Sequence, residues 1–142
     1  MNFPEATKTV VGDPANGTAG TATLTLDTLG FSYASIDVIV GKSSTASHTA
    51  ASILNSLTLT QGDTTAAGNA VYTVAVPAAS VAVTSQASVV RLDVDLRGKS
   101  RYLKVDASAV GSLPTNIVAR LGRAEIGPDS ASEIGALAKY SG

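Results

Sequence analysis

The chain predicts an all-β fold: an antiparallel β-sandwich, or jelly-roll-like barrel, with one short helix and extended terminal arms. Short segments alternate apolar and polar residues and are separated by turn residues, which is typical of strands with one buried face. Strand and helix patterns do not alternate along the chain, so a parallel α/β sheet is not expected. The 142 residues fit one domain, and with 4% aromatic residues and no Trp its core must consist of Val, Leu, Ile and Ala.

The first two strands show the clearest patterns. Thr21–Leu26 alternates strictly, and Phe31–Val40 forms a longer strand before Gly41. One face of this longer strand is more uniformly apolar and is expected in the core: Ser32, Ala34, Ile36, Val38 and Val40. Further strands are expected at Leu57–Gln61, Val71–Val76 and Ile117–Ile126, with Ala78–Ala87 as either a loose edge strand or a loop.

A change of period predicts the helix. In Ser43–Ser56, Ser44 or Thr45 can cap a helix in which Ala46, Ala50, Ile53, Leu54 and Leu57 recur at helical spacing. This short helix is expected to cover one end of a sheet.

The segment Val89–Asp106 predicts a β-hairpin with a type II′ turn at Gly98–Lys99. In that register Val94 would meet Leu103 and Leu92 would meet Val105 on an apolar face. The opposite face would pair Asp95 with Tyr102, Asp93 with Lys104 and Arg91 with Asp106.

Three regions follow from this pattern: an arm at 1–20, a β-sandwich at 21–127 and a tail at 128–142. Frequent Pro and Gly argue against regular structure in the arm, which is either a disordered terminus or an arm that orders on a neighbour. The tail has capping-box spacing at Ser130–Glu133 and too few apolar residues to be stable alone.

No catalytic, cofactor or metal site is expected. Cys is absent and His48 is the one histidine, which argues against a nucleophilic triad and a structural zinc site. Asp93 and Asp95 share a strand face and could act as paired carboxylates, but cross-strand partners favour a solvated sheet face. The acidic residues in turns form no calcium loop, and no glycine-rich phosphate loop is present.

Partners are expected to be proteins. A net charge of −1 gives no basic footprint for nucleic acid or for an anionic membrane, and the start MNFPEATKTVVGD lacks the pattern of a signal peptide. Basic residues gather in the second half of the chain, where they form either a solvated sheet face or a surface for an acidic partner. The candidate contact residues are Phe3, Pro4, Val10, Val11, Arg97, Lys99, Arg101, Ile134, Leu137 and Tyr140.

Three stretches resemble a known family. SYASIDVIVGKSS, LTLTQGDTT and VVRLDVDLRGKSRYLKV, taken in this order between Ser32 and Val105, are similar to the capsid decoration, or cement, proteins of tailed bacteriophages. Asp95–Leu103 is the most specific part, and the arm and the tail fall outside the resemblance.

The resemblance implies a non-enzymatic structural protein of the virion. Such a protein is made in the host cytoplasm, sits on the outer surface of the expanded head and clamps major capsid subunits, which stabilises the head. It would associate as a homotrimer, with a dimer as the alternative. A carbohydrate-binding or adhesive β-module, from a tail fibre or a cell surface, is the other function that Thr- and Ser-rich strands fit. A third, an enzyme using Asp93 and Asp95, is weaker.

Overall fold

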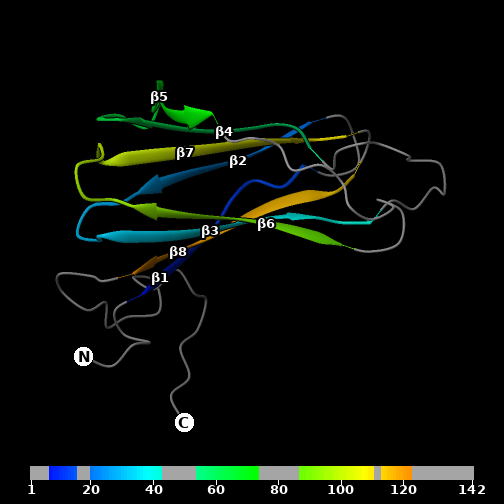
Figure 1. The fold of residues 1–142 in the computed structure, drawn as a ribbon, viewed down its shortest axis with the longest axis horizontal. Coiled ribbons are helices and arrows are strands. Elements are labelled where there is room, and N and C mark those ends of the chain that lie inside the picture. The colour runs from blue at the N-terminus through cyan, green and yellow to red at the C-terminus, as the bar shows by residue number, and fades with distance from the viewer. Residues whose placement is uncertain (1–6, 16–19, 43–53, 74–86, 111–112, 123–142) are drawn as a thin grey trace, which may run out of the picture.

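The protein folds as two antiparallel β-sheets packed face to face (Figure 1). This computed structural model describes residues 7–15, 20–42, 54–73, 87–110 and 113–122. The strands are β1 (Lys8–Val11), β2 (Thr21–Asp27), β3 (Tyr33–Val40), β4 (Leu54–Gly62), β5 (Asn69–Thr73), β6 (Ser88–Asp95), β7 (Tyr102–Ala109) and β8 (Thr115–Gly122).

The strand order is that of a jelly roll. Sheet A has the order β1-β8-β3-β6 and sheet B the order β2-β7-β4-β5. Four antiparallel pairs join the first half of the chain to the second half: β1·β8, β2·β7, β3·β6 and β4·β5. The pairs are nested in the chain order, with β4·β5 as the central pair. Folding this double ribbon over itself gives the two sheets. The fold class is therefore confirmed.

The core lies between the sheets and is aliphatic. Every member of the described core cluster is Ala, Val, Leu or Ile, and Phe31 packs at its margin. The predicted inner face of β3 is correct, because Ala34, Ile36 and Val38 are fully buried. Leu92 and Val94 of β6 face Leu103 and Val105 of β7 across this same core, and they too are buried as predicted.

The predicted hairpin at Val89–Asp106 is wrong, because β6 and β7 belong to different sheets. The Lys99 N–H donates to the Leu96 carbonyl at 3.0 Å, and Gly98 has φ +77°, which indicates a type II turn with Gly98 in its third position. Type II turns do not match the twist of a hairpin, so the strands diverge. Neither of the two predicted charge pairs, Asp93–Lys104 and Arg91–Asp106, forms, because Arg91 binds Asp37 and Lys104 binds Asp106.

Neighbouring loops bind this connection between the sheets. Leu96 N–H donates to the Ser32 carbonyl at 3.1 Å. The backbone N–H and the hydroxyl of Thr28 both donate to the Arg101 carbonyl, at 2.9 and 2.7 Å. The connection therefore satisfies its backbone groups without a partner strand.

Two other predictions need correction. Leu54–Ser56, the end of the predicted helix, belong to strand β4, while 43–53 lie outside the described residues. The described part of the predicted arm contains strand β1, which pairs with β8, and Asp13 and Ala15 form further bridges to the sandwich. The residues 74–76, 78–86 and 123–142, which include ends of two predicted strands and the tail, lie outside the described residues.

Candidate interaction surface

Within the described part of the chain, no three His, Cys, Asp or Glu side chains are grouped to hold a metal ion. Asp93 and Asp95 share the outer face of β6, as predicted, and both are exposed. The Asp95 carboxylate forms an ion pair with Arg97 of the adjoining loop. His48 lies outside the described residues.

The predicted cationic cluster at the β6–β7 turn is largely neutralised by the chain itself. The Arg97 guanidinium donates to both oxygens of Asp95, with Nη2–Oδ2 at 2.6 Å. Arg101 binds Asp27 in the same two-pronged way, at 2.7 and 2.9 Å, and its guanidinium lies 5.0 Å from the centre of the Tyr102 ring. Lys99 is exposed beside these pairs.

These ion pairs lower the pKa of both carboxyl groups. Side-chain hydrogen bonds from Arg97, aided by its backbone N–H, lower the pKa of Asp95 to about 2. The pKa of Asp27 is also lowered, chiefly by hydrogen bonds from Arg101. The charges of Arg97 and Arg101 are therefore largely balanced by carboxylates of the same chain. This makes the β6–β7 turn a weaker candidate for contact with an acidic partner than the sequence indicates.

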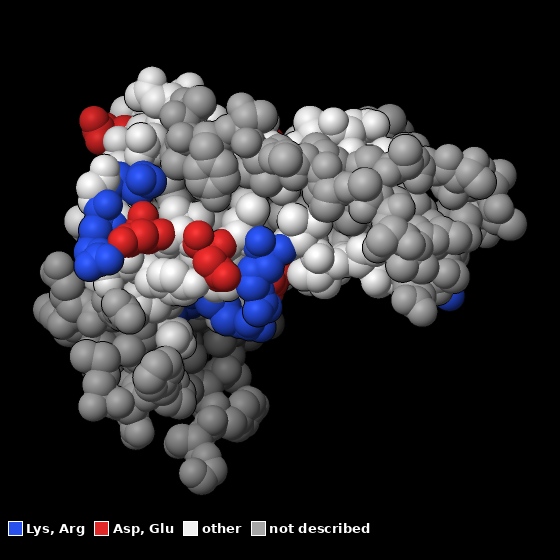
Figure 2. All heavy atoms as spheres, in the orientation of Figure 1, with Lys and Arg blue, Asp and Glu red and all other residues white. Residues whose placement is uncertain are grey.

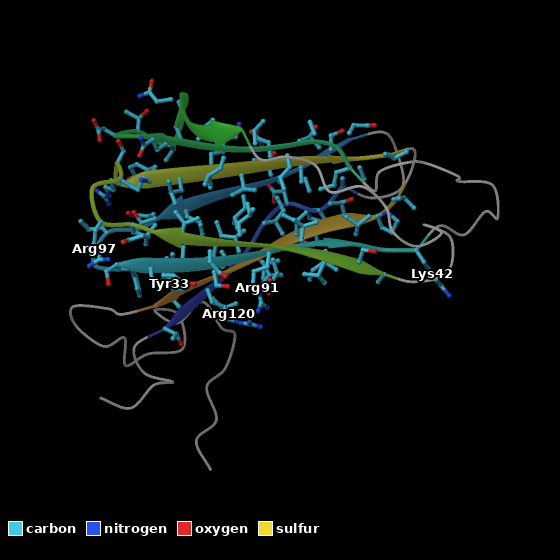
Figure 3. All side chains as sticks on the ribbon, in the orientation of Figure 1. Tyr33, Lys42, Arg91, Arg97 and Arg120 are labelled. Atoms are coloured by element: carbon cyan, nitrogen blue, oxygen red, sulfur yellow. The ribbon has the colours of Figure 1, made fainter. Side chains whose placement is uncertain are left out.

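The outer face of sheet A holds a second group of charges, which we call the A-face charges: Asp37, Arg91, Asp93 and Arg120. Asp37 and Arg91 are direct cross-strand partners on β3 and β6, and the guanidinium donates to both carboxylate oxygens, at 2.7 and 3.0 Å. Arg120 of β8 approaches the same carboxylate at 3.9 Å. These hydrogen bonds lower the pKa of Asp37. Figure 3 shows Arg91 and Arg120 close together, and Arg97 at the left end.

Both guanidiniums remain accessible although Asp37 is covered. The side chains of Arg91 and Arg120 are 56% and 61% exposed, against 13% for Asp37. In the space-filling view, acidic and basic atoms lie next to one another on the side of the molecule that faces the viewer (Figure 2). The A-face charges can therefore bind carboxylates and cations of a partner side by side.

An aliphatic stripe crosses the same face. It takes one outward-facing residue from each strand of sheet A: Val11, Val118, Ile39 and Val89. Val11 lies opposite Val118, Ile39 lies opposite Val89, and Val118 and Ile39 are diagonal neighbours, which places their side chains within contact range. Val11 and Val89 are each 58% exposed.

The outer face of sheet B is different. Its described side chains are mainly Thr and Ser, with Lys104 bound to Asp106 at 3.1 Å and the Thr23 hydroxyl donating to Asp106 at 2.7 Å. The exposed large hydrophobic side chains of the described residues are Val11, Leu29, Tyr33 and Val89, and all but Leu29 lie on the outer face of sheet A. This contrast identifies the outer face of sheet A as the better contact surface.

The first and last described strands lie side by side in sheet A. Strands β1 and β8 are neighbours, and Lys8 lies opposite Leu121. The segments 1–6 and 123–142 are thus attached at one corner of this sheet.

The contact residues predicted from sequence fare unequally. Val11 belongs to the aliphatic stripe, whereas Val10 faces inward and packs on the core. Phe3, Pro4, Ile134, Leu137 and Tyr140 lie outside the described residues. Sequence reasoning missed Ile39, Val89 and Val118, because single aliphatic residues at outward positions form a patch only once the strand order is known.

The three aromatic side chains whose burial the structure describes, Phe31, Tyr33 and Tyr102, do not share one surface. Phe31 packs against the core, while Tyr33 and Tyr102 lie on different sheets. No helix long and apolar enough to cross a membrane occurs in the described part of the chain. No family model matches this chain, and no curated protein or solved structure matches it significantly.

Proposed function

We propose that this protein is a non-enzymatic decoration protein of a tailed-bacteriophage head, which binds the outer surface of the expanded capsid and clamps neighbouring major capsid subunits. The observation that carries the proposal is the unequal character of the two outer faces. The outer face of sheet A presents the aliphatic stripe beside the A-face charges, whereas that of sheet B is a hydroxyl-rich surface suited to solvent. The sequence resemblance supplies the partner.

The position of the chain ends supports a clamp. Because the segments 1–6 and 123–142 are attached at one corner of sheet A, both are placed to extend a contact made by its outer face. Weak contacts from a rigid face and two tethered segments add through high effective concentration, and capsid symmetry repeats them.

Co-sedimentation with expanded heads that lack the protein tests this function. We expect saturable binding at a fixed ratio to the major capsid protein. The double variant Val11→Lys/Val118→Lys should weaken binding at least tenfold, because it places two charges in the aliphatic stripe. The matched control Thr25→Lys/Thr58→Lys alters the outer face of sheet B and should bind like the wild type. No binding by the wild-type protein would contradict the proposal and direct attention to a glycan screen.

Truncations test the terminal segments separately. Removal of 1–6 or 128–142 should weaken head binding while the sandwich stays folded, as checked by circular dichroism. A truncation through Val11 is unsuitable, because it removes strand β1 from sheet A. Unchanged binding by both shorter truncations would remove the terminal segments from the mechanism.

A further inference from the structure

Strand β6 is the outermost strand of sheet A, and half of its backbone groups point away from the sheet. The Leu96 N–H donates to Ser32, in line with the pairing of β6 with β3, and Gly41 N–H donates to Pro114, in line with the pairing of β3 with β8. Even-numbered residues of β3 therefore bond to β6, and odd-numbered ones to β8. It follows that Val89, Arg91, Asp93 and Asp95 direct their N–H and C=O groups to the open edge.

This edge is long and regular, and it differs from the outer edges of β1 and β2. Ser88–Asp95 is eight residues without Pro or Gly, whereas β1 has four residues. The outer edge of β2 is bridged by Asp13, whose N–H donates to the Thr23 carbonyl at 2.8 Å and whose carbonyl accepts from the Thr23 N–H at 3.2 Å. No described residue pairs with the outer edge of β6. An open edge of this kind is a template for another strand.

The charge pattern of β6 matches a second copy of itself. We propose that β6 pairs antiparallel with β6 of another copy of this chain about a two-fold axis, with Leu92 opposite Leu92 of the partner copy. In this register Arg91 lies opposite Asp93 of the partner copy, and the same pair recurs on the other side of the axis. Sheet A would thereby continue as one eight-stranded sheet through two copies, and the interface is self-complementary.

Neighbouring registers are worse on charge grounds. Hydrogen bonding requires odd-numbered residues to oppose odd-numbered ones, so one strand can shift along the other only by two residues at a time. A shift of two residues in one direction places Arg91 opposite Arg91 of the partner copy. A shift of two residues in the other direction places Asp93 opposite Asp93 of the partner copy. Like charges directly opposite destabilise an antiparallel pair, so the register with the Arg91–Asp93 pairs is preferred.

The side chains are available for this contact. Arg91 uses Nε and Nη2 for Asp37, which leaves the N–H groups of Nη1 for another carboxylate. Asp93 is exposed and has no hydrogen bond or ion pair with the described residues. Among the described residues, Asp93 has only the longer-range attraction of Arg91 on its own strand, and in the proposed dimer its carboxylate gains a direct ion pair.

The absence of native Cys allows a direct test of the register. We would mix an untagged Arg91→Cys variant with a size-tagged Asp93→Cys variant and oxidise them under mild conditions. Opposed residues in a hydrogen-bonded pair lie about 5.5 Å apart between Cα atoms, which suits a disulfide, whereas 91 and 91, or 93 and 93, are offset by two residues. We expect the mixed-size disulfide dimer to exceed both same-size dimers at least fivefold. The control pair Thr25→Cys and Thr58→Cys should give no such preference.

Charge exchange provides the second measurement, by light scattering. The wild-type protein should be a dimer, and Asp93→Arg and Arg91→Asp should each be monomeric, because each opposes like charges. An equimolar mixture of these two variants should recover the dimer, since every opposed pair is then of opposite charge. Thr58→Arg serves as the control and should stay dimeric.

Several results would overturn the proposal. A wild-type protein that stays monomeric at all concentrations tested would do so, as would equal yields of the three disulfide products. A trimer whose cross-links avoid β6 would also reject it. Capture of the major capsid protein by the Arg91→Cys variant, without dimers of this chain, would assign the edge to that protein instead. The disulfide yields and the light-scattering masses measured on this chain alone do not depend on binding to heads, so these two measurements are separate from the test of the proposed function.

Discussion

Asp37 and Arg91 face each other across β3 and β6, and this carboxylate is the most enclosed acidic group of the outer sheet surfaces among the ion pairs described. The backbones of Asp37 and Arg91 do not hydrogen-bond to each other, and in such antiparallel pairs the opposed side chains approach most closely. The side chain of Asp37 is 13% exposed, against 54% for Asp95 in the Arg97 pair. Burial reduces screening by solvent and salt, so we expect the Asp37–Arg91 pair to stabilise the fold more than the Asp95–Arg97 pair does.

Replacement of each acid tests this difference. Asp37→Asn should lower the urea midpoint measurably, because it leaves Arg91 and Arg120 near each other without a shared counter-charge. Asp95→Asn should change it less, because its pair lies in solvent. The difference should shrink in 1 M salt. Equal midpoints for both variants at low salt would contradict this ranking.

Acid should destabilise the protein through these same carboxyl groups. The pKa of Asp95 is about 2 in the folded protein, below the ordinary 3.8, so its stabilisation is present above pH 4 and is lost as pH falls through 2. The lowered pKa values of Asp27 and Asp37 act in the same direction. We expect the free energy of unfolding to decline from pH 4 to pH 2. An NMR titration should find Asp95 near 2, and in Arg97→Ala its pKa should rise toward 3.8.

Gly98 is required by the turn between the sheets. Its φ of +77° lies in a region that side chains with a Cβ avoid, so Gly98→Ala should cost about 1–2 kcal/mol although no neighbour lies within 4 Å of the added atom. Gly68→Ala is the matched control, because that site has equal space and no positive φ. Thermal unfolding of both variants measures the difference. A neutral Gly98→Ala would argue against the type II turn.

The aliphatic core should be sensitive to lost volume. Leu103 is fully buried on β7, so Leu103→Ala should destabilise the protein by about 2–5 kcal/mol through lost burial and an unfilled cavity. Thr58→Ala, on the exposed outer face of β4, should change stability by less than about 0.5 kcal/mol. Urea denaturation with unchanged slopes would establish that both values refer to the same transition.

The alternation of apolar and polar residues is sufficient to predict the buried face of each strand but not the strand with which it pairs. The sequence pattern correctly places Leu92, Val94, Leu103 and Val105 in the core, because side-chain direction depends only on the period of each strand. It assigns β6 and β7 to one hairpin, since a glycine between two alternating segments is the usual local sign of one. The deciding contacts are distant in sequence: β6 pairs with β3, and β7 with β2 and β4.

The same limit applies to the surface. Val11 stood out as an apolar residue in a segment rich in Gly and Pro, and it lies in the aliphatic stripe. Val89 and Val118 give no such sign, because they belong to ordinary strand patterns and join the stripe only through the strand order β1-β8-β3-β6. For Arg91 and Asp93 the sequence predicts the wrong partners, because it pairs β6 with β7 in one hairpin, whereas β6 pairs with β3.

The nested pairing of the strands has a mechanical consequence. The first residue of β1 lies opposite the penultimate residue of β8, so a force that separates the two chain ends acts on the hydrogen bonds of this pair one after another, as a zipper opens. Such loading needs less force than shearing all bonds of a pair at once. If the terminal segments serve as tethers, strain on them would detach β1 first and leave the inner pairs β3·β6 and β4·β5 intact.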